Sequence, residues 1–173
     1  MLDRRGERAW PVLNPVDAPA AVEAAAEPLG DLLDDVNHVV SVDLYPVVEA
    51  ASGQGDNGKL VQAVLDAGHR QDRFISVLSA LEPARSWREV VHRDATEGGL
   101  MPRYRIIDRT PDQIRQAGEL ADGIADLIES HLGRIRTAAE VVTSFASLGA
   151  RWTRQLLLVS DEWATILHLW VGD

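Results

Sequence analysis

The C-terminal third of the chain carries the pattern that most constrains its fold. Apolar and small residues recur there at alternating spacings of four and three, the repeat of a helix that buries one face. The first series consists of Ile114, Gly118, Ala121, Ala125, Ile128, Leu132 and Ile135. It follows Thr110-Pro111-Asp112-Gln113, which supplies a capping box and a proline at the first helical position. The pattern predicts a helix over 111–132.

A second series continues toward the C-terminus. Its members are Ala138, Val142, Phe145, Gly149, Trp152, Trp163 and Trp170. Thr137 and Glu140 have the spacing of another capping box. We predict a long helix over 138–170, either continuous or divided into two at Gly149, that lies antiparallel to the first helix and buries its tryptophans in the core. His168 would then lie on the exposed side of this helix.

Charged residues argue against a membrane location for this segment. Arg151, Arg154, Asp161 and Glu162 interrupt it, whereas a spanning helix needs about 20 apolar residues. Its polar face is mixed and has no lysine, which does not suit the membrane surface either. The N-terminus has no apolar signal segment and the chain has no cysteine, so we expect a cytoplasmic protein.

The rest of the chain predicts shorter helices. An irregular arm over 1–16 precedes them, and the only strand-like stretch, 102–108, is too solitary to build a sheet. The predicted helices start at residue 17 and include 29–40, 59–67, 70–82 and one that opens at Ser86-x-x-Glu89. We therefore expect an all-α protein with a single domain over 17–173. It would be a helical bundle with short acidic helices over 17–99 and a long antiparallel helical hairpin over 110–173.

The charge of the chain is unevenly placed. No lysine or arginine lies between Arg8 and Lys59, and the chain has a net charge of −10. The acidic residues of this interval are Asp17, Glu23, Glu27, Asp31, Asp34, Asp35, Asp43, Glu49 and Asp56. Such a surface repels nucleic acid and favours encounter with a basic protein. The alternative is that the charge only keeps the protein soluble.

One acidic cluster is a candidate site. Asp31, Asp34, Asp35 and His38 have the spacing of one helix face, opposite the leucine-valine stripe. Clustered carboxylates suit a hard cation, but one exposed helix face provides no enclosing ligands, so we expect no metal. We interpret the cluster as a solvated face or a partner-binding surface. If it binds a partner, reversing the three aspartates to lysine should abolish binding and leave the fold intact.

The sequence shows no signature of a catalytic site. Its five histidines, His38, His69, His92, His131 and His168, are scattered, and it has no phosphate-binding loop or dinucleotide-binding glycine pattern, so we expect no cofactor. Arg85 is followed by His92 after six residues, a spacing that resembles the Arg-x4–6-His element of HEPN ribonucleases. An alternative function therefore stays open: a small enzyme with histidines on its bundle helices, either a HEPN-like ribonuclease, as this resemblance implies, or a metal-dependent hydrolase.

The segment "KLVQAVLDAGHRQDRFISVLSALEPARSWREVV" (59–91) resembles the C-terminal half of the effector-associated domains of bacterial conflict systems. These domains are small death-like helical adaptors, and the resemblance implies recruitment of another protein. We accordingly predict a non-catalytic interaction or assembly module. It would bind a protein partner, basic in character, or itself as a homo-oligomer.

Overall fold

The structure is a computed structural model that describes residues 13–34, 38–53, 55–100, 109–144 and 150–172. It contains both helices and strands, so the prediction of an all-α helical bundle is wrong. The helices are α1 (Ala18–Leu33), α2 (Asn57–Ala67), α3 (Ser86–Thr96) and α4 (Pro111–Leu132), with short 3-10 turns at Pro15–Asp17 and Ala50–Gly53. The strands are β1 (Val39–Leu44), β2 (Val48–Glu49), β3 (Phe74–Leu81), β4 (Thr137–Thr143), β5 (Trp152–Val159) and β6 (Trp163–Gly172).

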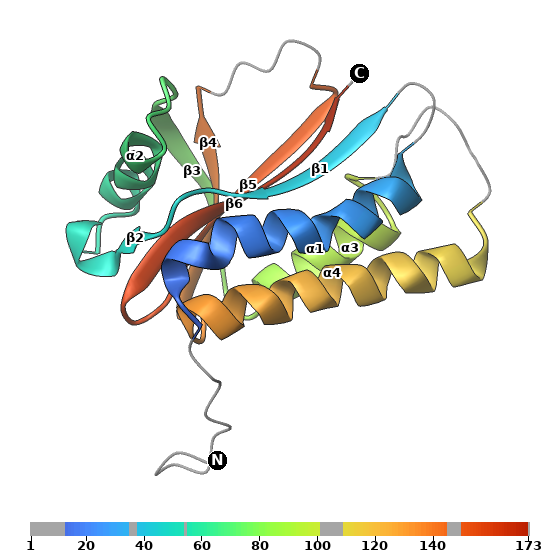
Figure 1. Ribbon diagram of the computed structural model, residues 1–173. Coiled ribbons are helices and arrows are strands. Elements are labelled where there is room, and N and C mark those ends of the chain that lie inside the picture. Colours follow the sequence, from blue (N-terminus) through green and yellow to red (C-terminus); the bar gives the residue numbers. More distant parts are fainter. Residues whose placement is uncertain (1–12, 35–37, 54, 101–108, 145–149, 173) are drawn as a thin grey trace, which may run out of the picture.

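The strands form one antiparallel sheet with helices on both faces (Figure 1). Its order is β1-β6-β5-β4-β3, and β2 pairs with the start of β6. The edges of this order are therefore β1 and β3. Helices α1, α3 and α4 pack on one face against Leu156, Leu158, Leu167 and Leu169, whereas α2 packs on the other face against Leu157 and Ile166. Alternate side chains of β5 and β6 thus enter two different cores.

The segment 138–170, for which a long helix was predicted, instead contributes to three strands, β4, β5 and β6. Central strands covered on both faces are apolar at consecutive positions, as in the run 156–159, and such runs fit a helix as well as a strand. Two hydrogen bonds close the turn between β5 and β6. Ser160 N–H donates to Trp163 C=O at 2.8 Å, and Trp163 N–H donates to Ser160 Oγ at 3.1 Å. The predicted helical hairpin does not exist.

The tryptophans of this region do not share one face. Trp152 and Trp163 are partly buried against the three-helix core. Trp170 lies on the opposite face of β6, where its Nε1 donates to Asp43 Oδ2 at 2.8 Å. The sheet separates them because strand side chains alternate with a period of two.

Two further predicted helices differ from the structure. The segment 70–82 contains β3, and the helix predicted over 29–40 ends at Leu33, after which the chain becomes β1. Pro28 lies inside α1 without ending it. The predictions over 1–12 and 102–108 lie outside the described residues.

Three helices are confirmed. The prediction over 59–67 corresponds to α2, where the side chain of Asp56 accepts from two backbone N–H groups of the first turn. The helix over 111–132 is α4, with its capping box of Thr110 and Gln113 in place. The helix opening at Ser86 is α3, although no side chain caps its first turn. None of the described helices is long and apolar enough to cross a membrane.

Candidate functional site

The edge strand β1 directs part of its backbone away from the sheet. Tyr45, directly after β1, donates its N–H to Ile166 C=O of β6 at 2.9 Å, whereas Val40 donates its N–H to the Asp34 carboxylate at 2.7 Å. Because strand backbone groups alternate in direction, the N–H and C=O of Val42 also point away from β6. No described strand pairs with this side of β1.

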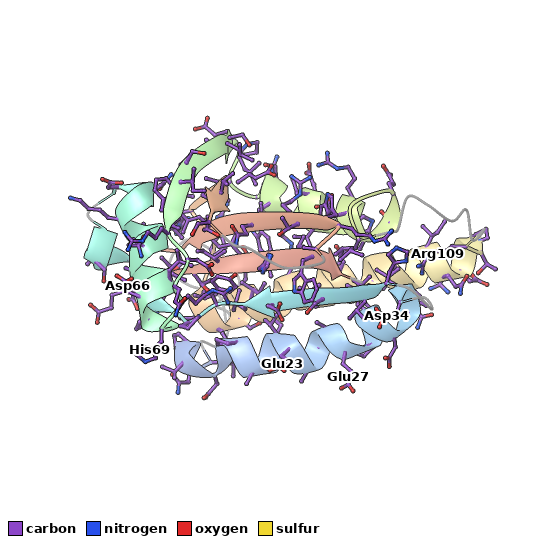
Figure 2. The ribbon with its side chains drawn as sticks, turned by 90° about the horizontal axis from the view of Figure 1, so that it is seen from above. Glu23, Glu27, Asp34, Asp66, His69 and Arg109 are labelled. Carbon is purple, nitrogen blue, oxygen red and sulfur yellow. The ribbon has the colours of Figure 1, made fainter. Side chains whose placement is uncertain are left out.

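A groove of about 560 Å³ lies between α1 and β1. Helix α1 runs beside the strand at the edge of the sheet (Figure 2). The two elements come close at Gly30, where a Cβ atom would lie 3.2 Å from the carbonyl oxygen of Val40. The titratable residues lining the groove are all acidic: Glu23, Glu27, Asp31, Asp34 and Asp43. The groove therefore carries concentrated negative charge along an unpaired strand edge.

Two of these carboxylates are engaged inside the fold. Asp34 accepts the hydrogen bond from Val40, and Asp43 accepts from Ser41 Oγ at 3.1 Å and from Trp170 Nε1. The remaining three acids are Glu23, Glu27 and Asp31. They are exposed, and no ion pair to another described residue is formed by any of them.

Arginine 109 is a cation close to the C-terminal end of α1 (Figure 2). Arg109 donates to the backbone carbonyls of Leu32 and Leu33 at 2.7 and 2.8 Å. These carbonyls belong to the last turn of α1, where a positive charge also interacts favourably with the helix dipole. In these contacts Arg109 stabilises the helix end and leaves the acids of the middle of α1 uncovered.

The structure describes three of the four predicted site residues, and these three do not share one helix face. Asp31 and Asp34 both line the groove, whereas Asp35 lies outside the described residues. His38 follows the end of α1 and is only 5% exposed. The expected single helix face is absent because α1 ends at Leu33.

Sequence reasoning missed Glu23, Glu27 and Val42 as site residues. The signal for the strand edge was present in the alternation of Val40, Val42 and Leu44 with polar residues. Val40 also continues the helical stripe that precedes it, so the alternation alone did not distinguish a strand from a helix.

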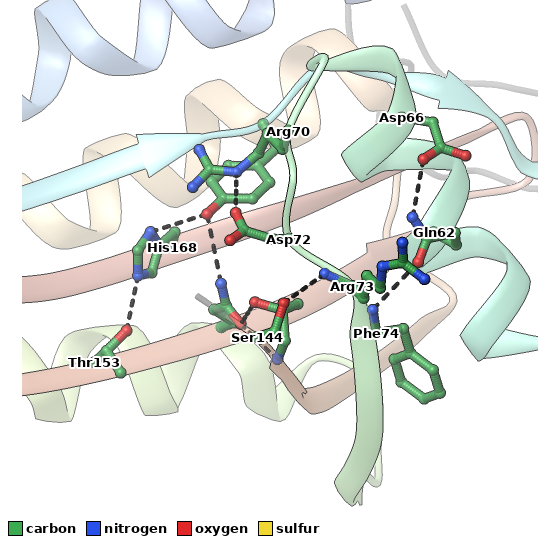
Figure 3. A network of polar contacts seen from close by, with 12 residues as sticks. Gln62, Asp66, Arg70, Asp72, Arg73, Phe74, Ser144, Thr153 and His168 are labelled. Carbon is green, nitrogen blue, oxygen red and sulfur yellow. Dashed lines mark hydrogen bonds and ion pairs between the residues drawn. The ribbon is translucent and has the colours of Figure 1, made fainter. Parts of the chain in front are cut away.

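A polar network occupies the opposite face of the sheet (Figure 3). His168 lies between two hydroxyl groups, with Nδ1 at 3.2 Å from Tyr45 Oη and Nε2 at 2.7 Å from Thr153 Oγ1. Gln155 donates to the Tyr45 hydroxyl at 3.4 Å. Arg70 covers the Tyr45 ring, with its guanidinium carbon 4.4 Å from the ring centroid. The histidine that the sequence placed on an exposed face is therefore buried.

Burial keeps His168 and Tyr45 neutral near pH 7. It lowers the pKa of His168 to about 4 and raises the pKa of Tyr45 above its ordinary value. Both ring nitrogens of His168 have hydroxyl partners. A neutral, hydrogen-bonded histidine at 2% exposure is a structural group of the interior rather than a proton carrier open to substrate.

A second cleft, of about 470 Å³, lies between α3 and α4. His92 Nδ1 lies 3.2 Å from Asp122 Oδ1, and both side chains are about half exposed. Arg88 beside them forms ion pairs with Asp126 and Glu129. Arg85, the other member of the predicted ribonuclease element, lies two helical turns from His92, about 10 Å along the axis. The arrangement provides one exposed histidine-carboxylate pair without a converging cation from Arg85.

The described residues contain no group of three or more histidine, aspartate or glutamate side chains placed to hold a metal ion. Comparison of the chain with protein-family models, curated proteins and solved structures gives no match. The function is therefore argued from the geometry and charge of the groove and the clefts.

Proposed function

We propose that this chain is a non-catalytic protein-binding module that binds a basic segment of a partner in the groove between α1 and β1. The observation that carries the proposal is the lining of this groove. Its titratable residues are all carboxylates, and Glu23, Glu27 and Asp31 have no cationic partner among the described residues. A cation that enters the groove meets negative charge that the fold does not use.

The charge also indicates which partners the groove excludes. Phosphate backbones are repelled because nucleic-acid affinity depends on neutralisation by lysine and arginine. A second copy of the chain would bring the same acidic groove and a net charge of −10. A basic protein segment has the complementary charge and would be attracted over about a Debye length, 10 Å at 0.1 M salt.

The rival hypothesis is a small enzyme that uses histidines. Such a site needs a concave pocket with converging polar groups. His168 is enclosed by its own network, and His131 contacts the backbone carbonyl of Asn14 at 2.8 Å. His92 does lie in a cleft beside a carboxylate, that of Asp122. Both side chains of this pair are about half exposed to solvent. The groove is the better supported site.

Selection from a displayed library of random peptides tests the proposal. The wild-type chain should enrich peptides rich in lysine and arginine, and enrichment should fall as salt rises. A variant with neutral groove acids, Glu23→Gln/Glu27→Gln/Asp31→Asn, should lose this enrichment. Failure of the wild-type chain to enrich cationic peptides would contradict a binding role for the groove.

The matched control removes the same number of charges elsewhere. Glu49, Glu82 and Glu162 are exposed and do not line the groove. The variant Glu49→Gln/Glu82→Gln/Glu162→Gln should select the same peptides as the wild-type chain. Equal losses in the two variants would show that only net charge matters. The resemblance of 59–91 to effector-associated adaptors stays a separate prediction, on which the groove does not depend.

A further inference from the structure

We infer that the exposed edge strand β3 forms a two-fold interface with β3 of a second copy of this chain, in which the two strands run antiparallel. The occupant of this surface is the chain itself, and the product is a homodimer. Three features of β3 support the inference. These are the exposure of its apolar side chains, the absence of charge along it and the opposite charges at its two ends. None of them depends on the binding proposed for the groove.

β3 carries apolar side chains at the surface of the molecule. Ile75, Val77 and Leu78 are 59%, 40% and 61% exposed. α2 packs against the first residue of the strand, Phe74, and leaves these three uncovered. On the other edge strand, in contrast, Val42 is only 3% exposed beside α1. A contiguous group of exposed aliphatic side chains marks a surface for association with another molecule.

The irregularity of β3 favours contact through side chains rather than through a hydrogen-bond ladder. The pairing of β3 with β4 shifts register twice, at Ile75 and at Leu78, so neither residue has a partner directly opposite on β4. Bulges of this kind bend an edge strand, which hinders further strand pairing, and they redirect side chains. We therefore expect the two copies to join by packing of their exposed aliphatic side chains.

The composition of β3 suits contact with a second copy. None of its eight residues is charged, whereas edge strands commonly carry charges that oppose self-association. The acids of the groove lie beside β1, at the opposite edge of the sheet (Figure 2). Four inter-strand spacings, about 19 Å in total, separate the two edges, which exceeds the Debye length of about 10 Å at 0.1 M salt. The groove acids therefore oppose association at β3 only weakly.

Opposite charges flank the strand and select the orientation of the two copies. Arg73 precedes β3 and Glu82 follows it, and both residues are exposed. Neither forms an ion pair with another described residue. A two-fold axis that crosses β3 near its middle makes the two strands antiparallel, which brings Arg73 of each copy beside Glu82 of the other. A parallel arrangement would instead bring like charges together.

Sedimentation velocity of the full chain over a concentration series tests the inference. The wild-type chain should pass from monomer to dimer as its concentration rises and form no larger species, because a two-fold interface closes on itself. The variant Ile75→Lys/Leu78→Lys places four cations in the interface and should weaken the dimer by more than about 100-fold. The matched control, Val16→Lys/Val39→Lys, changes two aliphatic residues that are 74% and 49% exposed elsewhere and should dimerise like the wild-type chain.

Charge reversal tests the antiparallel arrangement. Arg73→Glu breaks both symmetric ion pairs and should weaken the dimer roughly tenfold, since an exposed pair contributes up to about fivefold. Glu82→Arg should weaken it by a similar factor. The double variant Arg73→Glu/Glu82→Arg restores opposite charges across the axis and should return the dissociation constant to within about threefold of the wild-type value. A double variant as weak as the single variants would show that the arrangement is wrong.

A single introduced thiol locates the two-fold axis, because the chain has no cysteine of its own. Val77→Cys, in the middle of β3, should form a disulfide-linked dimer under mild oxidation, which a non-reducing gel detects. Val39→Cys, on the other edge strand, is the control and should cross-link much more slowly. Equal cross-linking at the two positions would contradict the proposed interface. This measurement does not depend on the folding of the lysine variants.

The outcomes are separate from those of the peptide selection. A wild-type chain that stays monomeric at every concentration, a dimer that the lysine substitutions in β3 leave intact, or an open-ended assembly would each overturn the inference. None of these results bears on the groove, which lies at the other edge of the sheet. The variant Ile75→Lys/Leu78→Lys should therefore select the same cationic peptides as the wild-type chain while it sediments as a monomer.

Discussion

Arg154 of β5 forms an ion pair with Asp94 of α3, with Nε 2.7 Å from Oδ2. The two atoms lie at ion-pair distance without the alignment of a hydrogen bond. The Arg154 guanidinium also donates to Glu140 of β4 at 2.7 Å. Asp94 is 3% exposed, and burial raises the pKa of its carboxyl group while Arg154 opposes that rise. The pair therefore links a helix to the centre of the sheet through a charge that has little access to water.

Replacement of Arg154 by methionine should destabilise the fold strongly. It leaves the Asp94 carboxylate buried without its cation, which typically costs about 3–5 kcal/mol. The double variant Asp94→Asn/Arg154→Met removes both charges and should recover a large part of this loss. Urea unfolding of the single and double variants measures both effects. As a control, Arg136→Met breaks an exposed pair with Asp161 and should cost less than about 1 kcal/mol.

His168 should make stability depend on pH. Its pKa in the fold is about 4, lower than the ordinary histidine value of 6.5, so the unfolded chain takes up the proton first as pH falls. Its contribution to the free energy of unfolding is complete above about pH 6.5 and should fall by roughly 2–3 kcal/mol on acidification to pH 4, at 1.36 kcal/mol per tenfold change in proton affinity. The surrounding charges of Asp43, Arg70 and Asp72 are included in this pKa.

The variant His168→Gln isolates this contribution. Glutamine does not titrate, so the difference in unfolding free energy between wild type and variant should shrink as pH falls from 6.5 to 4. Asp94, whose pKa is raised, contributes with the opposite sign in both proteins and cancels in the difference. A constant difference between wild type and His168→Gln would contradict the assignment.

Gly99 should not tolerate a side chain. A Cβ atom at this position would lie 2.4 Å from the Trp152 ring, which packs against the three-helix core. Gly99→Ala should therefore lower the free energy of unfolding by about 1–3 kcal/mol, the usual cost of overpacking. The adjacent Gly98 has no atom within 4 Å of its Cβ position, so Gly98→Ala should be neutral or slightly stabilising. Equal stability of the two variants in thermal unfolding would contradict this packing.

The sequence predicted the elements whose ends have local chemical signals. Helix α4 has a cap, a proline and a glycine stop, and its small residues are explained by close packing: a Cβ at Gly118 would lie 2.6 Å from His92 of α3. The C-terminal strands lack such signals, because burial on both faces removes the alternation of polar and apolar residues. Their pairing partners are also distant in sequence, as with β1 and β6.

The candidate site was only partly predictable for the same reason. The acidic interval indicated a binding surface for a basic partner, and Asp31 and Asp34 do line the groove. The strand edge beside them depends on β6 pairing with one side of β1, so that the other side faces α1. That arrangement arises from contacts between residues more than 120 positions apart, such as Val42 and Leu169, which a local pattern does not contain.

Alanine substitutions of Asp34 and Asp31 should change the free energy of unfolding by different amounts, although both residues are acidic and line the groove. Asp34→Ala removes the acceptor of the Val40 N–H and should lower the free energy of unfolding by about 1.5–3 kcal/mol, the range for a hydrogen bond to a charged group. Asp31→Ala removes an exposed carboxylate and should change stability by less than about 0.5 kcal/mol. The same variant should weaken the binding of a lysine-rich peptide to the groove about threefold.

Reversing Asp31, Asp34 and Asp35 to lysine, which the sequence suggested would leave the fold intact, therefore combines two effects. The Asp34 substitution breaks the connection between the end of α1 and the start of β1, so part of any lost binding would come from lost structure. Chemical denaturation and peptide calorimetry on the single variants separate the two. A destabilised Asp31→Ala variant, or an Asp34→Ala variant as stable as wild type, would contradict this division of roles.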